Sequence, residues 1–145
     1  MIDLLDVNVW LALVDENHAL HENAISYWQD QSASDIAFCR VTALAFLRLS
    51  THPKILSRPL TTDEAWEIYQ RYRTEAQVGF VVDSPDIDHS FMALSRQPGL
   101  SHHLWTDCYL AALAQCRKCR LVSFDEDFNN FRDLKFLHLA SYTNS

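Results

Sequence analysis

The sequence predicts an α/β protein with a central, mostly parallel sheet of about five strands and helices on both faces. Short apolar runs alternate with longer segments of helical apolar spacing, and no linker, repeat or low-complexity stretch interrupts the alternation. Strands separated by helices pair in parallel, because each helix returns the chain to the edge where the previous strand started. A chain of 145 residues, 48% of them apolar, is long enough for one packed domain over residues 1–145.

The predicted strands are short apolar runs bounded by polar residues, and they lie at residues 2–5, 36–39, 78–82, 120–124 and 136–139. The predicted helices have apolar residues three or four positions apart, and they lie at residues 9–14, 18–30, 42–51, 61–76, 84–97 and 107–114. A polar break at residues 32–35 precedes the second strand, and residues 102–105 predict a weak strand or a loop.

Local sequence signals mark two of the predicted helix ends. Thr61 and Glu64 have the spacing of a capping box, in which each side chain satisfies a backbone N–H of the other residue. Pro53 ends the preceding helix, because the residue before a proline avoids helical backbone angles. These signals place a loop between the third and fourth predicted helices.

Composition excludes several classes of protein. With only two glycines, the chain holds neither a dinucleotide-binding nor a Walker-type phosphate loop. Its first residues are too polar for a signal peptide or a membrane helix, so we expect a cytoplasmic protein that does not enter membranes. The formal net charge of −7 argues against nucleic-acid binding over the whole surface. It does not exclude a nuclease, since an acidic metal site itself contributes negative charge.

Two groups of residues with the types that bind metals have simpler interpretations. The four cysteines include the pair Cys116 and Cys119 at C-x-x-C spacing, but no second pair matches it, so we expect ordinary reduced thiols. His18 and His21 lie three residues apart at a helix start with no third ligand nearby, and we do not expect a metal there.

Three carboxylates follow predicted strands or begin predicted helices, and these are Asp6, Asp107 and Asp125. In a parallel sheet such positions meet at the carboxyl edge, where α/β proteins bind their ligands. Two carboxylates 4 Å apart repel by about 4 kcal/mol at an effective dielectric near 20, so a cluster of them either takes up protons or binds cations. Oxygen ligands favour Mg²⁺ or Mn²⁺. The alternative is that Asp6 or Asn8 only caps the following helix.

Five stretches of the chain resemble motifs of the PIN domain family, and in particular its VapC-type toxins, and they lie at residues 5–11, 18–21, 42–53, 106–114 and 121–128. The resemblance spans nearly the whole chain in the right order and spacing. It implies a three-layer PIN-like fold and a metal-dependent endoribonuclease that cleaves tRNA, rRNA or mRNA and inhibits translation. It further implies a cognate VapB-type antitoxin and a homodimer.

The resemblance also implies roles for individual residues. It makes Asp6, Asp107 and Asp125 the catalytic ligands of Mg²⁺ or Mn²⁺. It makes Asn8 and Ser123 positions that orient the ligands or a water. Supporting roles outside this group fall to Asp127, an outer carboxylate or a solvated helix-start acid, and to Arg48, which contacts an RNA phosphate or pairs with a carboxylate.

One departure from the family pattern is Ala45, which stands where many PIN domains carry a glutamate. Glu16 and Asp127 are both candidates to replace the missing carboxylate. The departure leaves open a catalytically weak PIN-like module that only binds a partner. Another alternative is a haloacid-dehalogenase-like phosphatase that uses Asp6 as nucleophile, although such enzymes need an acid where this chain has Asn8.

Overall fold

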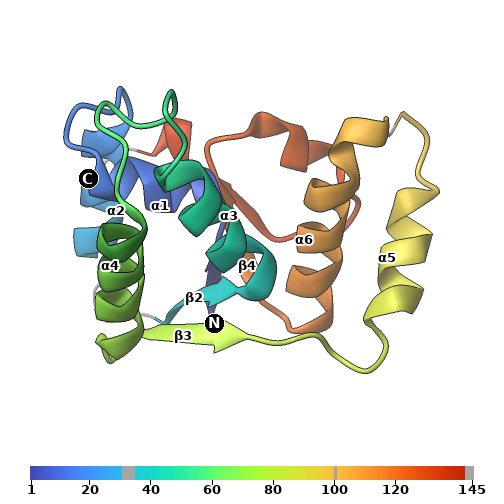
Figure 1. The fold of residues 1–145 in the computed structure, drawn as a ribbon. Coiled ribbons are helices and arrows are strands. Elements are labelled where there is room, and N and C mark those ends of the chain that lie inside the picture. The colour runs from blue at the N-terminus through green and yellow to red at the C-terminus, as the bar shows by residue number, and fades with distance from the viewer. Residues whose placement is uncertain (31–34, 100, 143–145) are drawn as a thin grey trace.

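The computed structural model describes residues 1–30, 35–99 and 101–142, with the side chain of His103 also outside the description. Its centre is a five-stranded sheet in the order β3-β2-β1-β4-β5 (Figure 1). All neighbouring strands pair in parallel, which confirms the predicted sheet. The strands are β1 (Asp3–Leu5), β2 (Ile36–Cys39), β3 (Val78–Val81), β4 (Arg120–Ser123) and β5 (Phe136–His138).

Helices cover both faces of the sheet, as Figure 1 shows. The α-helices are α1 (Val7–Val14), α2 (His21–Asp30), α3 (Arg40–Ser50), α4 (Thr62–Thr74), α5 (Ile87–Ser95) and α6 (Trp105–Cys116). Three short 3₁₀ helices are η1 (His102–Leu104), η2 (Glu126–Asn130) and η3 (Leu139–Ser141). Helices α1 to α4 pack in one apolar cluster and α5, α6 and η2 in another, so the molecule has three layers.

The alternation of side chains along the strands explains the two clusters. In β2, Ile36 and Phe38 enter the cluster with α1 to α4, whereas Ala37 and Cys39 enter the cluster with α5 and α6. The first cluster is centred on Trp10, whose ring stacks on Phe38 with a centroid separation of 3.8 Å. Both faces of the sheet are therefore buried, as expected for parallel strands covered on two sides.

A buried ion pair lies at the amino end of the sheet. Arg120 on β4 donates through Nε to Asp3 Oδ1 at 3.0 Å and through a terminal nitrogen to Oδ2 at 2.7 Å. The hydroxyl of Tyr27 also donates to Asp3 Oδ2, at 2.6 Å. Asp3 is buried, so these three donors replace the water that its carboxylate loses on folding.

Two helix starts differ from the prediction. Helix α3 begins at Arg40 rather than Thr42, because the Thr42 hydroxyl accepts the N–H of Cys39 at 2.9 Å and so satisfies the exposed start of an earlier turn. The weak strand or loop predicted at residues 102–105 is wrong, since η1 leads directly into α6 at Trp105. The capping box of Thr61 and Glu64 is present as predicted.

The remaining expectations concern the polar break, the cysteines and membrane-spanning helices. Most of the polar break predicted at residues 32–35 lies outside the described residues. The four cysteines are free thiols. In the part of the chain that the structure describes, no helix has the length and apolarity needed to span a membrane.

Candidate acidic metal site

Four carboxylates gather where β1 and β4 end. Asp6 follows β1 and is the N-cap of α1, while Asp125 follows β4 and is the N-cap of η2. Asp127 lies in the first turn of η2, and Asp107 in the first turn of α6. Strands β1 and β4 are neighbours in the sheet, so their carboxyl ends bring Asp6 and Asp125 to the same edge.

Asp6 is the buried member of this group. Its Oδ1 accepts the N–H of Val7 at 2.7 Å and its Oδ2 accepts the hydroxyl of Ser123 at 2.8 Å. Burial raises the pKa of Asp6 above its ordinary value, these two hydrogen bonds oppose the rise, and the charge of Asp125 adds to it. The carboxylate is thus held in a fixed orientation without a basic partner.

Ser123 connects the residues of this edge. While donating to Asp6, its hydroxyl oxygen accepts the N–H of Asp125 at 3.0 Å and the side-chain amide of Asn8 at 3.1 Å. The side-chain oxygen of Asn8 in turn accepts the backbone N–H of Phe124 at 3.4 Å. Of the two residues that the sequence offered as the helix cap, Asp6 is the cap, whereas Asn8 lies within α1 and bridges to β4.

The pKa of Asp107 indicates that the four carboxylates share one site. Its side chain is half-buried, and its pKa is raised to about 7. Burial is the largest cause, followed by the charges of Asp6, Asp125 and Asp127. Each of these three carboxylates is therefore close enough to oppose the ionisation of Asp107, although they come from the starts of α1 and η2 and Asp107 from α6.

The donor set fits a hard divalent cation. It consists of carboxylate oxygens and one hydroxyl, and a bound cation would relieve the repulsion that raises the pKa of Asp107. Within residues 1–30, 35–99 and 101–142, no three His, Cys, Asp or Glu side chains form a ready-made metal cage. Like charges repel one another, so closer approach of these carboxylates requires the ion itself.

The structure defines the roles of the other predicted site residues less closely than those of the carboxylates. Arg48 is exposed on α3 and forms no ion pair with any described residue, so the alternative that it pairs with a carboxylate is not observed. Glu16 lies beyond the end of α1 opposite Asp6, and a helix of eight residues is about 12 Å long. Asp127 acts on Asp107 directly and is the better candidate for the missing acid at Ala45.

Some side chains near the site had no assigned role in the sequence. His138, at the end of β5, has its Nε2 at 3.1 Å from the carbonyl of Phe124, just before Asp125. Its position at a strand end was the available signal. His21 instead contacts the Ala12 carbonyl through Nδ1 at 2.6 Å, and the Nδ1 of His18 accepts a backbone N–H, so both have structural partners.

Comparisons with known proteins agree on one family. The sequence pattern of the PIN domain matches residues 4–134. Ribonuclease VapC41 of Mycobacterium tuberculosis is 32% identical over 144 residues, which cover 94% of this chain and 98% of that protein. The structure of Mycobacterium tuberculosis VapC20, a sarcin–ricin loop cleaving toxin, superimposes with a TM-score of 0.68 at 14% identity, covering 92% and 98% of the two chains. VapBC2 from Rickettsia felis, bound to a promoter DNA fragment, gives a TM-score of 0.67 at 15% identity, covering 94% and 98%.

Proposed function

Because this chain belongs to the PIN domain family, we propose that it is the toxin of a type II toxin–antitoxin pair and an endoribonuclease that depends on Mg²⁺ or Mn²⁺. Residues 1–145 act as a single PIN-like domain that hydrolyses RNA phosphodiester bonds and thereby inhibits translation. The observation that carries the proposal is the convergence of Asp6, Asp107, Asp125 and Asp127 where β1 and β4 end, with the pKa of Asp107 raised by burial and by the other three charges. A relative at 32% identity is named a ribonuclease, which supports the same activity.

Each residue of the site has a role in this proposal. Asp6, Asp107 and Asp125 hold the cation, which when bound supplies a Lewis acid and an activated water for attack on phosphorus. Ser123 holds the second oxygen of Asp6, and Asn8 holds Ser123. Asp127 and Arg48 are supporting residues, the first as an outer carboxylate and the second as a contact to an RNA phosphate.

The proposed partners are RNA and an antitoxin in the cytoplasm. The substrate is a tRNA, rRNA or mRNA, and a VapB-type antitoxin neutralises the enzyme. The likeness in fold to the toxin of a VapBC complex supports the second partner. A homodimer is proposed from the family resemblance and is consistent with exposed apolar side chains on α3 and α5, among them Leu44 and Met92.

The two alternatives are less consistent with the site. A phosphatase needs Asp6 as a free nucleophile, but both of its oxygens accept hydrogen bonds and the residue is only 8% exposed. A module that only binds a partner follows from the alanine at position 45, yet four carboxylates still interact at this edge.

A nuclease assay tests the proposal. Purified protein is incubated with total RNA and Mg²⁺ or Mn²⁺, beside Asp6→Asn and Asp107→Asn variants and the control Asp63→Asn, which changes an exposed acid at the start of α4. We expect cleavage by the parent and the control only. Equal cleavage by all four proteins overturns the assignment, and an acyl-phosphate trapped on Asp6 supports the phosphatase instead. Sequencing of the RNA ends then identifies the target.

A further inference from the structure

We propose that a second surface, outside the acidic site, binds the phosphate backbone of the RNA substrate. This basic face consists of Arg96 at the end of α5, Lys118 after α6, and Arg132 and Lys135 in the segment before and at the start of β5. The inference rests on the proposed function, since it concerns how the RNA strand continues beyond the bond that is cut.

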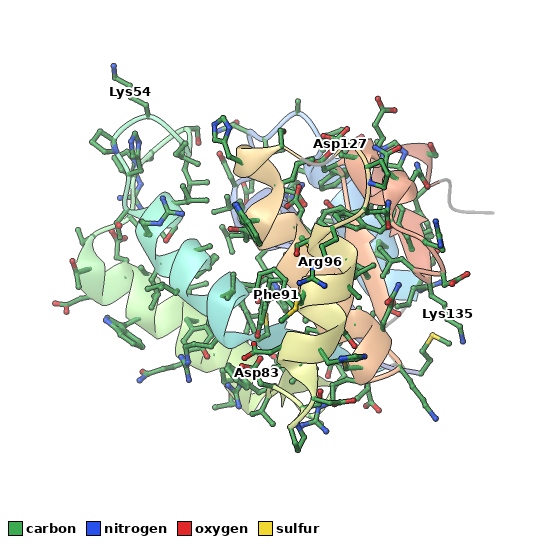
Figure 2. All side chains as sticks on the ribbon, turned by 90° about the vertical axis from the view of Figure 1, so that its right-hand side faces the viewer. Lys54, Asp83, Phe91, Arg96, Asp127 and Lys135 are labelled. Carbon is green, nitrogen blue, oxygen red and sulfur yellow. The ribbon has the colours of Figure 1, made fainter. Side chains whose placement is uncertain are left out.

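The basic face is concave. One cavity of about 370 Å³ is bordered by Arg96 and Arg132, and a second of about 300 Å³ by Lys118 and Lys135. The two cavities share Gln115 and Asp133, so together they form one continuous hollow surface. Figure 2 shows Arg96 and Lys135 in one view of the side that carries α5.

The charge of this surface is the opposite of that of the molecule. Its lining contains four cations and one carboxylate, Asp133, in a protein whose formal net charge is −7. Over the described residues, none of the four cations forms an ion pair. By contrast, Arg58, Arg71 and Arg120 are each paired with an acid. A phosphate approaching here meets four cations against one carboxylate, and none of the four is held in an ion pair with a described residue.

Side-chain amides fix the backbone that presents Arg132. The Gln97 side chain accepts the N–H of Arg132 at 3.3 Å and donates to the carbonyl of Asn130 at 2.5 Å. Gln115 donates to the carbonyl of Arg132 at 2.6 Å. The segment is therefore tied to α5 and α6 on both sides of Arg132, which lowers the entropy lost when a ligand binds there.

The position of the face favours RNA over an acidic peptide. Residues 131–135 lead from η2, which carries Asp127 of the acidic site, to the amino end of β5. Asp127 appears above Arg96 and Lys135 in Figure 2. An RNA strand that crosses the acidic site is repelled by the other carboxylates of the protein. Contacts between the phosphates of the strand and the basic face position the strand without reading its sequence.

Equilibrium binding at several salt concentrations tests the inference. The probe is a fluorescein-labelled single-stranded RNA of 20 nucleotides, and every protein carries Asp6→Asn so that the RNA stays intact in Mg²⁺. Asparagine is also a good N-cap, so this background keeps the start of α1. The test variant is Arg96→Gln with Arg132→Gln. The control is Arg71→Gln with Arg73→Gln on α4, which removes the same charge from the other side of the molecule (Figure 1).

We expect the test variant to bind about tenfold more weakly near 0.1 M salt, with the slope of log Kd against log salt reduced by about 1.4, or 0.7 for each lost phosphate contact. The control keeps the slope of the Asp6→Asn background. Replacing Arg132 by Glu instead of Gln in the test variant weakens RNA binding further. This comparison separates the effect of charge from the effect of lost packing. Identical slopes for test and control, no RNA binding by the background protein, or weakened binding of an antitoxin peptide alone each overturn the inference. Cleavage by the unsubstituted protein decides the proposed function separately.

Discussion

Ser123 donates its hydroxyl to Asp6 across 2.8 Å and thereby joins the end of β4 to the start of α1. The same oxygen accepts the N–H of Asp125, so one small side chain contacts two of the proposed ligands. Side chains that hydrogen-bond to a metal ligand fix its orientation and its charge, and their loss weakens metal binding.

Replacing Ser123 by alanine should weaken metal binding. The hydrogen bond from Ser123 lowers the pKa of Asp6, so its removal raises that pKa and makes protons compete better with the cation. We expect Mn²⁺ affinity, measured by calorimetry, to fall about 10- to 100-fold. Ser123→Thr keeps the hydroxyl and should stay near the parent value. An unchanged affinity in Ser123→Ala would show that Ser123 acts on the fold alone.

The raised pKa of Asp107 predicts a pH dependence of stability without metal. The folded protein holds a proton on Asp107 up to about pH 7, whereas the unfolded chain loses it near the ordinary value of 3.8. Deprotonation therefore opposes folding, and the free energy of unfolding should decrease as pH rises from about 4 to 7. In denaturant titrations, Asp107→Asn should lack this part of the decrease, so its stability relative to the parent grows with pH. A constant difference between the two proteins contradicts the pKa.

Restoring an acid on α3 should strengthen the metal site. Ala45→Glu adds the carboxylate that the family resemblance implies at this position, and we expect Mn²⁺ to bind about tenfold more tightly because ligand charge tunes affinity. Leu44→Glu is the matched control, since Leu44 is the neighbouring residue and is 62% exposed. Equal gains in both variants would indicate a general effect of net charge rather than a ligand at position 45.

The ion pair at the amino end of the sheet should matter for stability and not for catalysis. Arg120→Ala leaves the buried Asp3 without its main partner, which should lower the free energy of unfolding by about 3–5 kcal/mol. Arg71→Ala removes an exposed pair with Glu67 and should cost less than about 1 kcal/mol. Thermal melts measure both. Similar losses would mean that burial of Asp3 contributes little.

The strands were predictable to within one residue because their apolar runs end at polar positions. The start of α6 was not, since the aromatic and branched side chains of residues 102–105 favour a strand locally, and packing of Trp105 against Phe91 decides for a helix. A local contact set the start of α3, where the Thr42 hydroxyl accepts the N–H of Cys39 three residues before it.

The site was predictable in its residues but not in its chemistry. The rule that parallel strands direct ligands to their carboxyl edge placed Asp6 and Asp125 together. It did not decide whether Asp6 or Asn8 caps α1, because the cap depends on where the chain turns, and the structure shows Asp6. The pKa of Asp107 depends on burial and on Asp127 from another element. The basic face also lay beyond sequence reasoning, because its four cations come from segments that only folding brings together.

The double use of Asp6 has an evolutionary consequence. In cells that lose the antitoxin, survivors are those with inactivated toxin genes. Replacement of Asp107, which is half-buried in the first turn of α6, leaves an intact fold that still captures antitoxin. Most replacements of Asp6 also remove the cap of α1 and the tie to β4, so they deplete the folded protein. When a second gene supplies the antitoxin, escape mutants at Asp107 should still bind it, whereas most escape mutants at Asp6 should not.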